Sequence, residues 1–318
     1  MRVLADPREW CEDRLHLAPD GHRRVADQRP LPAGVELRWS ARHGGVQPVD
    51  ADRVDSDAID INAVRAAFDA QIRRRTDSDE AGGVVEADDG VLRWVAPGSQ
   101  TSCIVWSQLS ADSADAVIGA QRAYFAARGT PVEWKYYDYD QPGDLPQRLL
   151  SAGFTPEDEE LMLVAETDSI SLEVVLPAGV RLVPVSDEAG IEAMMAVHEL
   201  AFDDPSPALG PRLAAQLRDA PDSLAMVVAM AGDEPVSAAR IEFVPGTDFA
   251  GLWGGGTIPA WRRQGIFRAL VAYRAGLAAA RGYRYLQVDA LPPSRPILQR
   301  LGFHAVATTT PYVFTPED

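Results

Sequence analysis

The sequence predicts an α/β protein made of two halves, each a mixed β-sheet flanked by helices. Candidate strands and helices alternate along both halves, which is the pattern of layered α/β domains. A polar stretch with Pro and Gly, from Glu166 to Gly179, separates the two patterned regions as an interdomain linker does. A length of 318 residues suits two domains. We therefore expect one domain in residues 1–170 and a second in residues 177–318.

In the second half the expected order is strand, two helices, three strands, helix, strand, helix, strand. Ser186 is a favourable N-cap for the first helix, and Gly282 stands where glycine commonly ends a long helix. Gly246-Thr247-Asp248 supplies a turn between two strands. The expected strands are residues 180–185, 224–230, 236–244, 249–258, 285–290 and 303–314, and the expected helices are 186–202, 211–220, 265–281 and 295–301.

The first half repeats much of this plan. Its expected strands are residues 84–87, 91–95, 103–108, 132–137 and 161–165, and its expected helices are 61–75, 112–128 and 145–151. Both long helices end in Ala-Ala-Arg-Gly, and a strand, a short helix and a Gly-Phe pair follow each of them. The shared order indicates an internal duplication. Residues 1–60, rich in Asp, Arg, Pro and Gly, show no clear pattern, and we expect part of them to be mobile.

Composition narrows the function classes. With 46% hydrophobic and 24% charged residues, no apolar run of eighteen and acidic residues at Asp6 and Glu9, the sequence predicts a soluble cytoplasmic protein without a secretory signal or membrane span. The net charge is -17, of which -13 falls in residues 1–170 and -4 in the remainder. Such acidity repels phosphate backbones, so nucleic acid is not an expected partner. The negative charge would attract cationic amines as substrates. Alternatively, it only keeps the protein soluble.

Neither cysteine nor histidine forms a metal-ligand pattern. Cys11 and Cys103 are far apart, and the five histidines match no zinc spacing. We assign no metal.

One segment carries the chemistry. Gly254-Gly255-Gly256 lies in an expected strand, where three glycines make sense if something must approach the backbone closely. The basic turn Arg262-Arg263-Gln264-Gly265-Ile266-Phe267-Arg268 then opens the long helix. The first turn of a helix has unpaired N–H groups and a positive partial charge. Together with the arginines it predicts a pyrophosphate-binding site.

This stretch resembles the Arg/Gln-x-x-Gly-x-Gly/Ala signature of the GNAT superfamily of acyl-CoA N-acyltransferases. Arg262 and Gly265 fill the first two places, and Phe267 departs from the small residue of the third. The segment Ser294-Arg295-Pro296-Ile297-Leu298-Gln299-Arg300-Leu301-Gly302-Phe303 resembles the closing helix and Gly-Phe of the family. The resemblance covers residues 178–314 and implies two tandem GNAT-like domains, the second of them catalytic.

The resemblance also implies a cofactor site for acetyl-CoA, the co-substrate. In such enzymes the strand before the loop splays from its neighbour, and the thioester arm lies along it. Backbone groups of Thr257 and Ile258 would contact the pantetheine arm, and the amides from Arg263 through Gln264, Gly265, Ile266 and Phe267 to Arg268 would hold the pyrophosphate. Ser294 would take over part of the bonding of an Asn that the family often has, where this chain has Leu291-Pro292-Pro293.

The acid and the base are less well marked. The family often has a Tyr, acting as general acid, where this chain has Leu298; water, Tyr283 or Tyr312 are the alternatives. For the base we consider Glu242, which shares a strand face with Arg240 and would otherwise form a surface ion pair. Asp289 is the second candidate, unless it caps the following turn. His198, Asp203, Asp204 and Trp253 could line the acceptor site or serve packing and surface roles.

The first half has lost the cofactor loop. Its corresponding segment, Leu109-Ser110-Ala111-Asp112-Ser113-Ala114-Asp115, has neither Gly nor Arg and puts two carboxylates where phosphates would bind. We interpret this half as a degenerate copy that braces the active domain or shapes the acceptor cleft.

Two functions from different classes remain. The first is direct transfer of an acetyl group from acetyl-CoA to the amine of a small molecule, without a covalent enzyme intermediate. The second is a non-catalytic acyl-CoA sensor. We expect a monomer or a homodimer in either case.

The loss of the loop from one half predicts a single acyl-CoA site per chain. Isothermal titration calorimetry with acetyl-CoA should give a stoichiometry close to one. A stoichiometry of two would contradict the hypothesis that the first half is a degenerate copy without a cofactor site.

Overall fold

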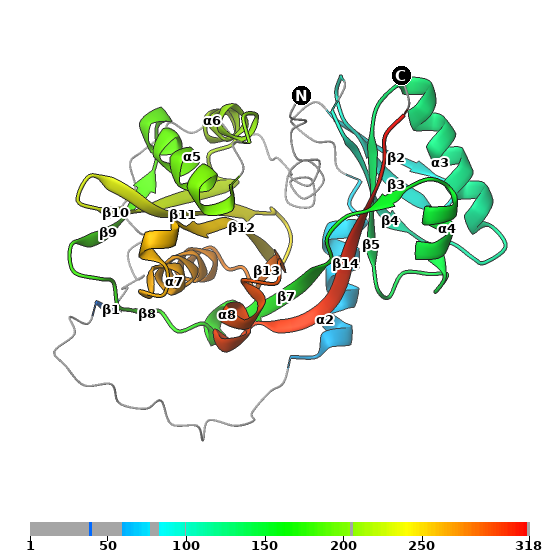
Figure 1. The fold of residues 1–318 in the computed structure, drawn as a ribbon. Helices are drawn as coiled ribbons and strands as arrows, with labels where there is room; N and C mark the ends of the chain where they lie inside the picture. The colour runs from blue at the N-terminus through cyan, green and yellow to red at the C-terminus, as the bar shows by residue number, and fades with distance from the viewer. Residues whose placement is uncertain (1–37, 40–58, 77–82, 99, 204–205, 317–318) are drawn as a thin grey trace.

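The computed structural model describes residues 38–39, 59–76, 83–98, 100–203 and 206–316 (Figure 1). In the first half the helices are α2 (Ile61–Phe68), continued by the π-helical turn η1 (Asp69–Arg73), α3 (Ala114–Arg128) and α4 (Leu145–Ser151). The strands are β2 (Val84–Asp88), β3 (Val91–Val95), β4 (Ser102–Ser107), β5 (Val132–Tyr137), β6 (Thr155–Pro156) and β7 (Glu160–Glu166).

The second half follows a connection that holds the 3₁₀ turn η2 (Thr167–Ser169) and β8 (Glu173–Val174), which pairs with β1 (Arg38–Trp39). Its helices are α5 (Glu188–Phe202), α6 (Leu209–Asp219), the 3₁₀ turn η3 (Pro259–Trp261), α7 (Ile266–Ala280) and α8 (Arg295–Arg300). Its strands are β9 (Val180–Val185), β10 (Leu224–Ala231), β11 (Glu234–Phe243), β12 (Phe249–Thr257), β13 (Tyr285–Ala290) and β14 (His304–Phe314).

The predicted fold class is confirmed, and each predicted helix and strand lies within two residues of its expected bounds. One cap was assigned wrongly. The first helix of the second half is capped by Asp187, whose carboxylate accepts from the backbone N–H of Gly190 at 2.9 Å, rather than by Ser186. The short strand β6 was not predicted. The expectation of mobility in residues 1–60 falls almost entirely outside the described residues.

The two halves share one continuous sheet because they exchange their last strands. The strand order is β2-β3-β4-β5-β14-β7-β13-β12-β11-β10-β9, with β6 pairing to β14. Thus β7 of the first half pairs with β13 of the second, while β14 of the second half pairs with β5 of the first. Figure 1 shows β14 running from one half into the other. The hydrogen bonding of the sheet therefore crosses the linker predicted from the sequence.

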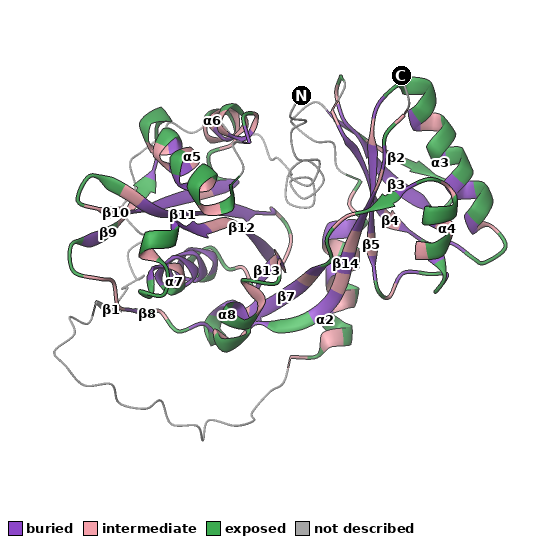
Figure 2. Cartoon of the chain, viewed as in Figure 1, coloured by how far each residue is buried: buried purple, intermediate pink, exposed green. Residues whose placement is uncertain are grey.

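Helix α2 seals the seam between the halves. Its Phe68 is fully buried and packs edge-on against Phe249 of β12, with ring centroids 5.4 Å apart, and beside Tyr137 of β5. Gln71 exchanges two hydrogen bonds with Asp248 in the β11–β12 turn, at 2.8 and 2.7 Å. Figure 2 shows the buried strands meeting between the two groups of helices. A helix of the first half thus belongs to the core that supports the second.

The connection between the halves is packed. Ile170 and Val174 are buried in the same core cluster as the inner face of α7. The linker therefore forms part of the hydrophobic core around α7.

The exchange predicts that the halves do not fold separately. Expressed alone, residues 171–318 lack β7 and would leave β13 with an exposed edge, so we expect aggregation. Co-expression of residues 1–170 with 171–318 should restore a soluble one-to-one complex, measured by size-exclusion chromatography. A monomeric 171–318 fragment that unfolds cooperatively would instead establish an independent second domain.

Candidate active site

The second half contains a gap in strand pairing next to the predicted cofactor loop. Strands β12 and β13 pair in parallel only from Phe249 to Gly251 and from Tyr285 to Gln287. Beyond that point, as far as the described residues show, β12 continues to Thr257 and β13 to Ala290 without pairing to each other. One edge of β12 therefore keeps backbone N–H and C=O groups that another extended chain could pair with.

A bulge bends β12 at the start of the separation. Ala238 pairs with Gly256 and Arg240 with Trp253, so Gly254 and Gly255 stand opposite Ala239 alone. Gly254 has φ +53, a conformation that glycine adopts readily. A bulge increases local twist and turns a strand away from its partner.

The glycines let helices approach β12 closely. A Cβ added to Gly256 would lie 2.8 Å from the Cβ of Ala201 in α5. A Cβ added to Gly255 would lie 3.1 Å from the ring of Phe267 in α7. Phe267, the departure from the family signature, therefore packs its ring against Gly255.

Arg274 of α7 hydrogen-bonds to the backbone beside the bulge. This fully buried side chain donates from Nη1 to the carbonyl of Arg240 at 3.0 Å and from Nε to that of Leu270. Burial, with a smaller contribution from the charge of Arg240, lowers the pKa of Arg274 to about 9. The sequence reasoning missed this residue, although an Arg in an Ala- and Leu-rich helix is a signal of such a role.

The loop before α7 presents backbone N–H groups. Gly265 caps the helix with φ +87, no side chain caps the first turn, and the first intrahelical bond runs from Ala269 N–H to the Gly265 carbonyl. Arg263 also has a positive φ, of 61. A helix N-terminus with free N–H groups and a positive partial charge binds anions.

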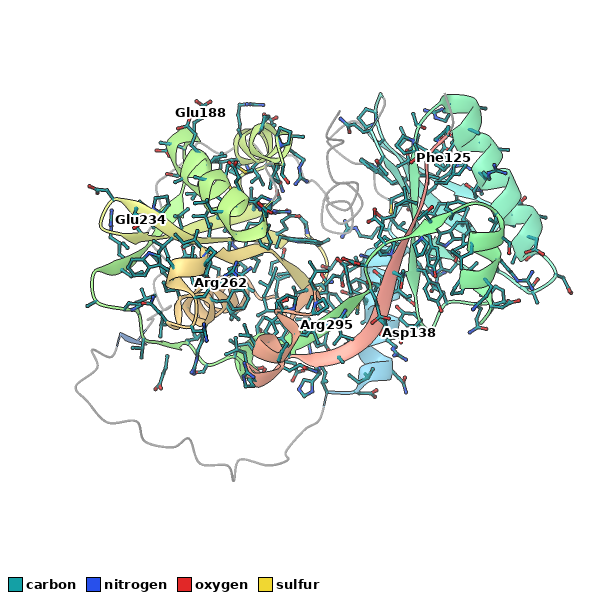
Figure 3. All side chains as sticks on the ribbon, in the orientation of Figure 1. Phe125, Asp138, Glu188, Glu234, Arg262 and Arg295 are labelled. Carbon is teal, nitrogen blue, oxygen red and sulfur yellow. The ribbon has the colours of Figure 1, made fainter. Side chains whose placement is uncertain are left out.

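The basic side chains of the loop divide into two groups. Arg262 donates to the carbonyls of Thr257 at 2.9 Å and Ala201 at 3.0 Å, so it ties β12 to α5. Figure 3 labels it beside α7. Arg263 and Arg268 are exposed and form no ion pair with another described residue. These two are the guanidinium groups available to a phosphate.

Four further residues of the expected cofactor site make contacts within the chain. The Ile258 N–H donates to the Val236 carbonyl at 3.1 Å, and the Thr257 hydroxyl contacts Ser237 at 2.7 Å. Gln264 donates to the carbonyl of Ala260 at 3.3 Å. Ser294 donates from its hydroxyl to the Leu291 carbonyl at 3.0 Å.

The candidate base Glu242 is buried. Its Oε1 accepts from Arg240 Nε at 3.1 Å, and its Oε2 has no hydrogen-bond partner among the described residues. The alternation that places Glu242 with Arg240 is confirmed, but the expected surface ion pair is wrong because both side chains are at least 95% buried. Gly251 separates Glu242 from Gln287 in the register of the sheet.

Asp289 lies on β13, two residues past the last pair with β12. Its fully buried carboxylate accepts from Gln287 Nε2 at 3.0 Å and lies 3.4 Å from Lys135 Nζ, which reaches over from β5. Burial raises the pKa of Asp289, and nearby Glu160 raises it further, while Lys135 lowers it. Its partners among the described residues are these two side chains rather than the following turn.

Three of the four candidates for the acceptor site lie within the described residues. His198 Nε2 lies 3.2 Å from the Ser206 hydroxyl, and its ring packs against that of Phe202 at an interplanar angle of 45°. Asp203 is the C-cap of α5 in a left-handed conformation. Asp204 lies outside the described residues. Trp253 is buried beside Arg240.

The positions considered for the general acid lie away from the separation between β12 and β13. Leu298 is buried in the core cluster of α7. Tyr283 follows the C-terminal end of α7, so the length of that helix, about 20 Å, separates it from Gly265. Tyr312 pairs with Trp134 of the first half.

The first half has the same separation of strands, and an arginine fills it. Strands β4 and β5 pair only as far as Ile104 and Trp134. The next carbonyl, of Val105, accepts from Arg73 Nε at 3.2 Å. Arg73 is fully buried and bonds both oxygens of Asp140, at 2.9 and 2.8 Å.

The start of α3, which corresponds to the cofactor loop, is acidic. Asp115 lies in its first turn and pairs with Arg148 at 2.9 Å. No side chain caps this helix either, but its charge opposes an anion.

These contacts predict which arginines bind phosphate. Replacing Arg263 and Arg268 together by Glu should weaken acetyl-CoA binding, because each charge-assisted hydrogen bond contributes about 1.5–3 kcal/mol, so that affinity falls by about two orders of magnitude or more. Calorimetry with acetyl-CoA measures this loss. The control is Arg218→Glu on α6, the same type of substitution at one arginine outside the loop, with half of the charge change. Equal affinity of the double variant and the control would remove both arginines from the site.

Comparison with known proteins agrees with this geometry. Residues 191–303 match the family model of the acetyltransferase (GNAT) family. No curated protein matches the chain. Among solved structures, a GCN5-related N-acetyltransferase from Kribbella flavida has a TM-score of 0.61 at 19% identity, covering 81% of this chain and 96% of that one. A tandem GNAT protein from the clavulanic acid biosynthesis pathway has a TM-score of 0.54 at 12% identity, covering 72% and 79%.

A functionally unknown protein from Staphylococcus epidermidis also matches, with a TM-score of 0.56 at 15% identity, covering 74% of this chain and 96% of that one. At these identities the solved structures show the fold alone, and the family model matches part of the second half. No helix in the described ranges is long and apolar enough to cross a membrane, and those residues include no cluster suited to a metal ion. Residues 191–303 thus match the model of the GNAT acetyltransferase family, and the fold of the chain is that of GNAT structures, among them a tandem GNAT protein.

Proposed function

We propose that this protein transfers an acetyl group from acetyl-CoA to the amine of a small molecule. The observation that carries the proposal is the open edge of β12 beside the start of α7. The edge ends within a few residues of free helix N–H groups and of Arg263 and Arg268. A ligand with an extended amide arm and a pyrophosphate fits both features at once.

The residues present fit acetyl-CoA, which supplies a reactive thioester. The N–H groups of Ile266, Phe267 and Arg268 would hold the pyrophosphate, and the two exposed arginines would neutralise its charge. The arm would run along β12 from Thr257 towards Gly251, where it would pair with the free strand edge. Backbone N–H groups at the glycine bulge would stabilise the developing oxyanion.

The acceptor amine must lose a proton before or during its attack. Glu242 and Asp289 lie on one sheet face, on the two sides of the separation. Because burial raises the pKa of Asp289, this carboxylate is a stronger base than an exposed aspartate. We assign proton removal to Asp289, with Glu242 holding the cationic acceptor.

Transfer would be direct. Cys103, the described cysteine, is buried in the first half, so it is not placed for a covalent intermediate. With Leu298 in the core, the leaving thiolate would be protonated by water.

A non-catalytic acyl-CoA sensor remains the second candidate. The observation that favours it is that both carboxylates already have cationic partners, Arg240 and Lys135. The cofactor loop serves either function.

A thiol-release assay with acetyl-CoA and a panel of small amines, polyamines, amino acids and aminoglycosides separates the two. We expect release with at least one acceptor. Asp289→Asn should lower kcat by about 10²–10⁴-fold while acetyl-CoA affinity is unchanged. The matched control is Glu188→Gln on the exposed start of α5, which should retain full activity. Tight acetyl-CoA binding with no release across the panel would favour the sensor.

A further inference from the structure

The degenerate half contributes directly to the carboxylate on which the proposed reaction depends. Lys135 is on β5, three strands away from Asp289 on β13, with β14 and β7 between them. Its ammonium lies 2.6 Å from Glu160 Oε2 and 3.4 Å from Asp289 Oδ2. The side chains of all three are at least 94% buried, so solvent screens their interaction little.

The lysine is singular in this chain. Of the 30 basic residues, Lys135 is the one lysine, and the rest are arginine. A buried lysine costs desolvation energy unless a carboxylate compensates it. Here two carboxylates share one ammonium, so the cluster carries a net negative charge of one when all three groups are ionised. Protonation or removal of any one of the three groups therefore changes the net charge that the other two experience.

The groups facing Asp289 come from several elements. Lys135 and Tyr137 are on β5, Glu160 is on β7, and Gln287 is on β13 itself. Behind Tyr137, whose hydroxyl has no hydrogen-bond partner among the described residues, lie Arg73 and Asp140 in their own ion pair. Lys135 favours the ionised form of Asp289, and Glu160 opposes it.

We propose that Lys135 and Glu160 of the first half set the ionisation of Asp289, and so act as positioning residues for proton removal from the acceptor amine. The inference rests on the proposed function, because Asp289 is the base assigned there. It gives the degenerate half a role in catalysis that does not require a cofactor loop. The strand exchange places β7 beside β13 and brings β5 close enough for Lys135 to reach Asp289.

The two positioning residues predict opposite shifts. The acid limb of kcat/KM against pH reports ionisation of the base in the free enzyme. Lys135→Met removes the favourable charge, so the limb should move to higher pH, by about one to three units. Glu160→Gln removes the like charge while Lys135 keeps its charge beside Asp289, so the limb should move to lower pH. Lys135→Arg keeps the charge and should restore the wild-type limb.

The kinetic arm uses the full chain, acetyl-CoA and the acceptor identified in the amine panel. A purely structural role would lower activity in both variants without moving the limb in opposite directions. Unchanged limbs in Lys135→Met and Glu160→Gln would overturn the proposal. If Lys135→Met does not fold, Glu160→Gln alone still tests the sign.

A second arm needs no turnover. Thermal unfolding of Lys135→Met is compared with that of Lys135→Met/Asp289→Asn across the pH range. A buried Asp289 without its cation binds a proton in the folded state, so its folded pKa rises above the unfolded value. The single variant should therefore lose stability relative to the double variant as pH rises through that window. The window should end at a higher pH than it does for the wild type compared with Asp289→Asn, where Lys135 is present. A pH-independent difference between them would overturn the inference, whereas silence in the amine panel alone would count against the proposed function only.

Discussion

The exchange of β7 and β14 between the halves is the constraint on which the rest of the structure depends. Each half lacks one strand of its own sheet and receives it from the other, so neither sheet is complete alone. The exchange merges two cores into one sheet and places α2 across the seam. It also brings β5 within reach of β13, and only for that reason can Lys135 contact Asp289. Strand pairing thus determines which side chains meet at the candidate site.

The two halves resolve the same local problem in different ways. Where two parallel strands separate, backbone groups on their edges lose partners and must find others. In the first half the Val105 carbonyl is satisfied by Arg73, and the buried guanidinium is compensated by Asp140, Asp69 and the face of Tyr137. Burial alone would lower the pKa of Arg73, but these neighbours raise it above its ordinary value. In the second half the buried Arg274 bonds the carbonyls of Arg240 and Trp253 at the bulge, and β12 and β13 have no described pairing beyond Gly251 and Gln287.

Much of the fold could be read from the sequence because its signals are local. Alternating apolar residues, helix-ending glycines and the repeated Gly-Phe pair gave the element order and the duplication. The candidate cofactor loop could be proposed for the same reason, since its residues are contiguous. The exchange could not be predicted, because the apolar pattern of β7 fits a place beside β5 of its own half as well as the place beside β13 that it takes. Local patterns specify which strands form, and long-range packing selects their partners.

The polar residues of the site show the same division. Alternation along β11 correctly paired Glu242 with Arg240, but it could not show that the pair is buried, because burial depends on helices distant in sequence. Lys135 and Arg73 were missed, since Glu160 lies 25 residues from Lys135 and Asp140 lies 67 residues from Arg73. Arg262 shows the converse: its motif position suggests phosphate binding, and its contacts with Thr257 and Ala201 show a tie between β12 and α5.

The loss of the loop from the first half is consistent with what that half must still do. An anion site at the start of α3 is no longer needed once Arg73 fills the strand separation, so Asp115 can pair there with Arg148. What the half cannot lose is β5 and β7, because they complete the sheet of the second half and carry the two charges around Asp289. A duplicated domain can therefore discard its cofactor chemistry while its strands remain indispensable. The residues that then matter in it are the ones that face its partner.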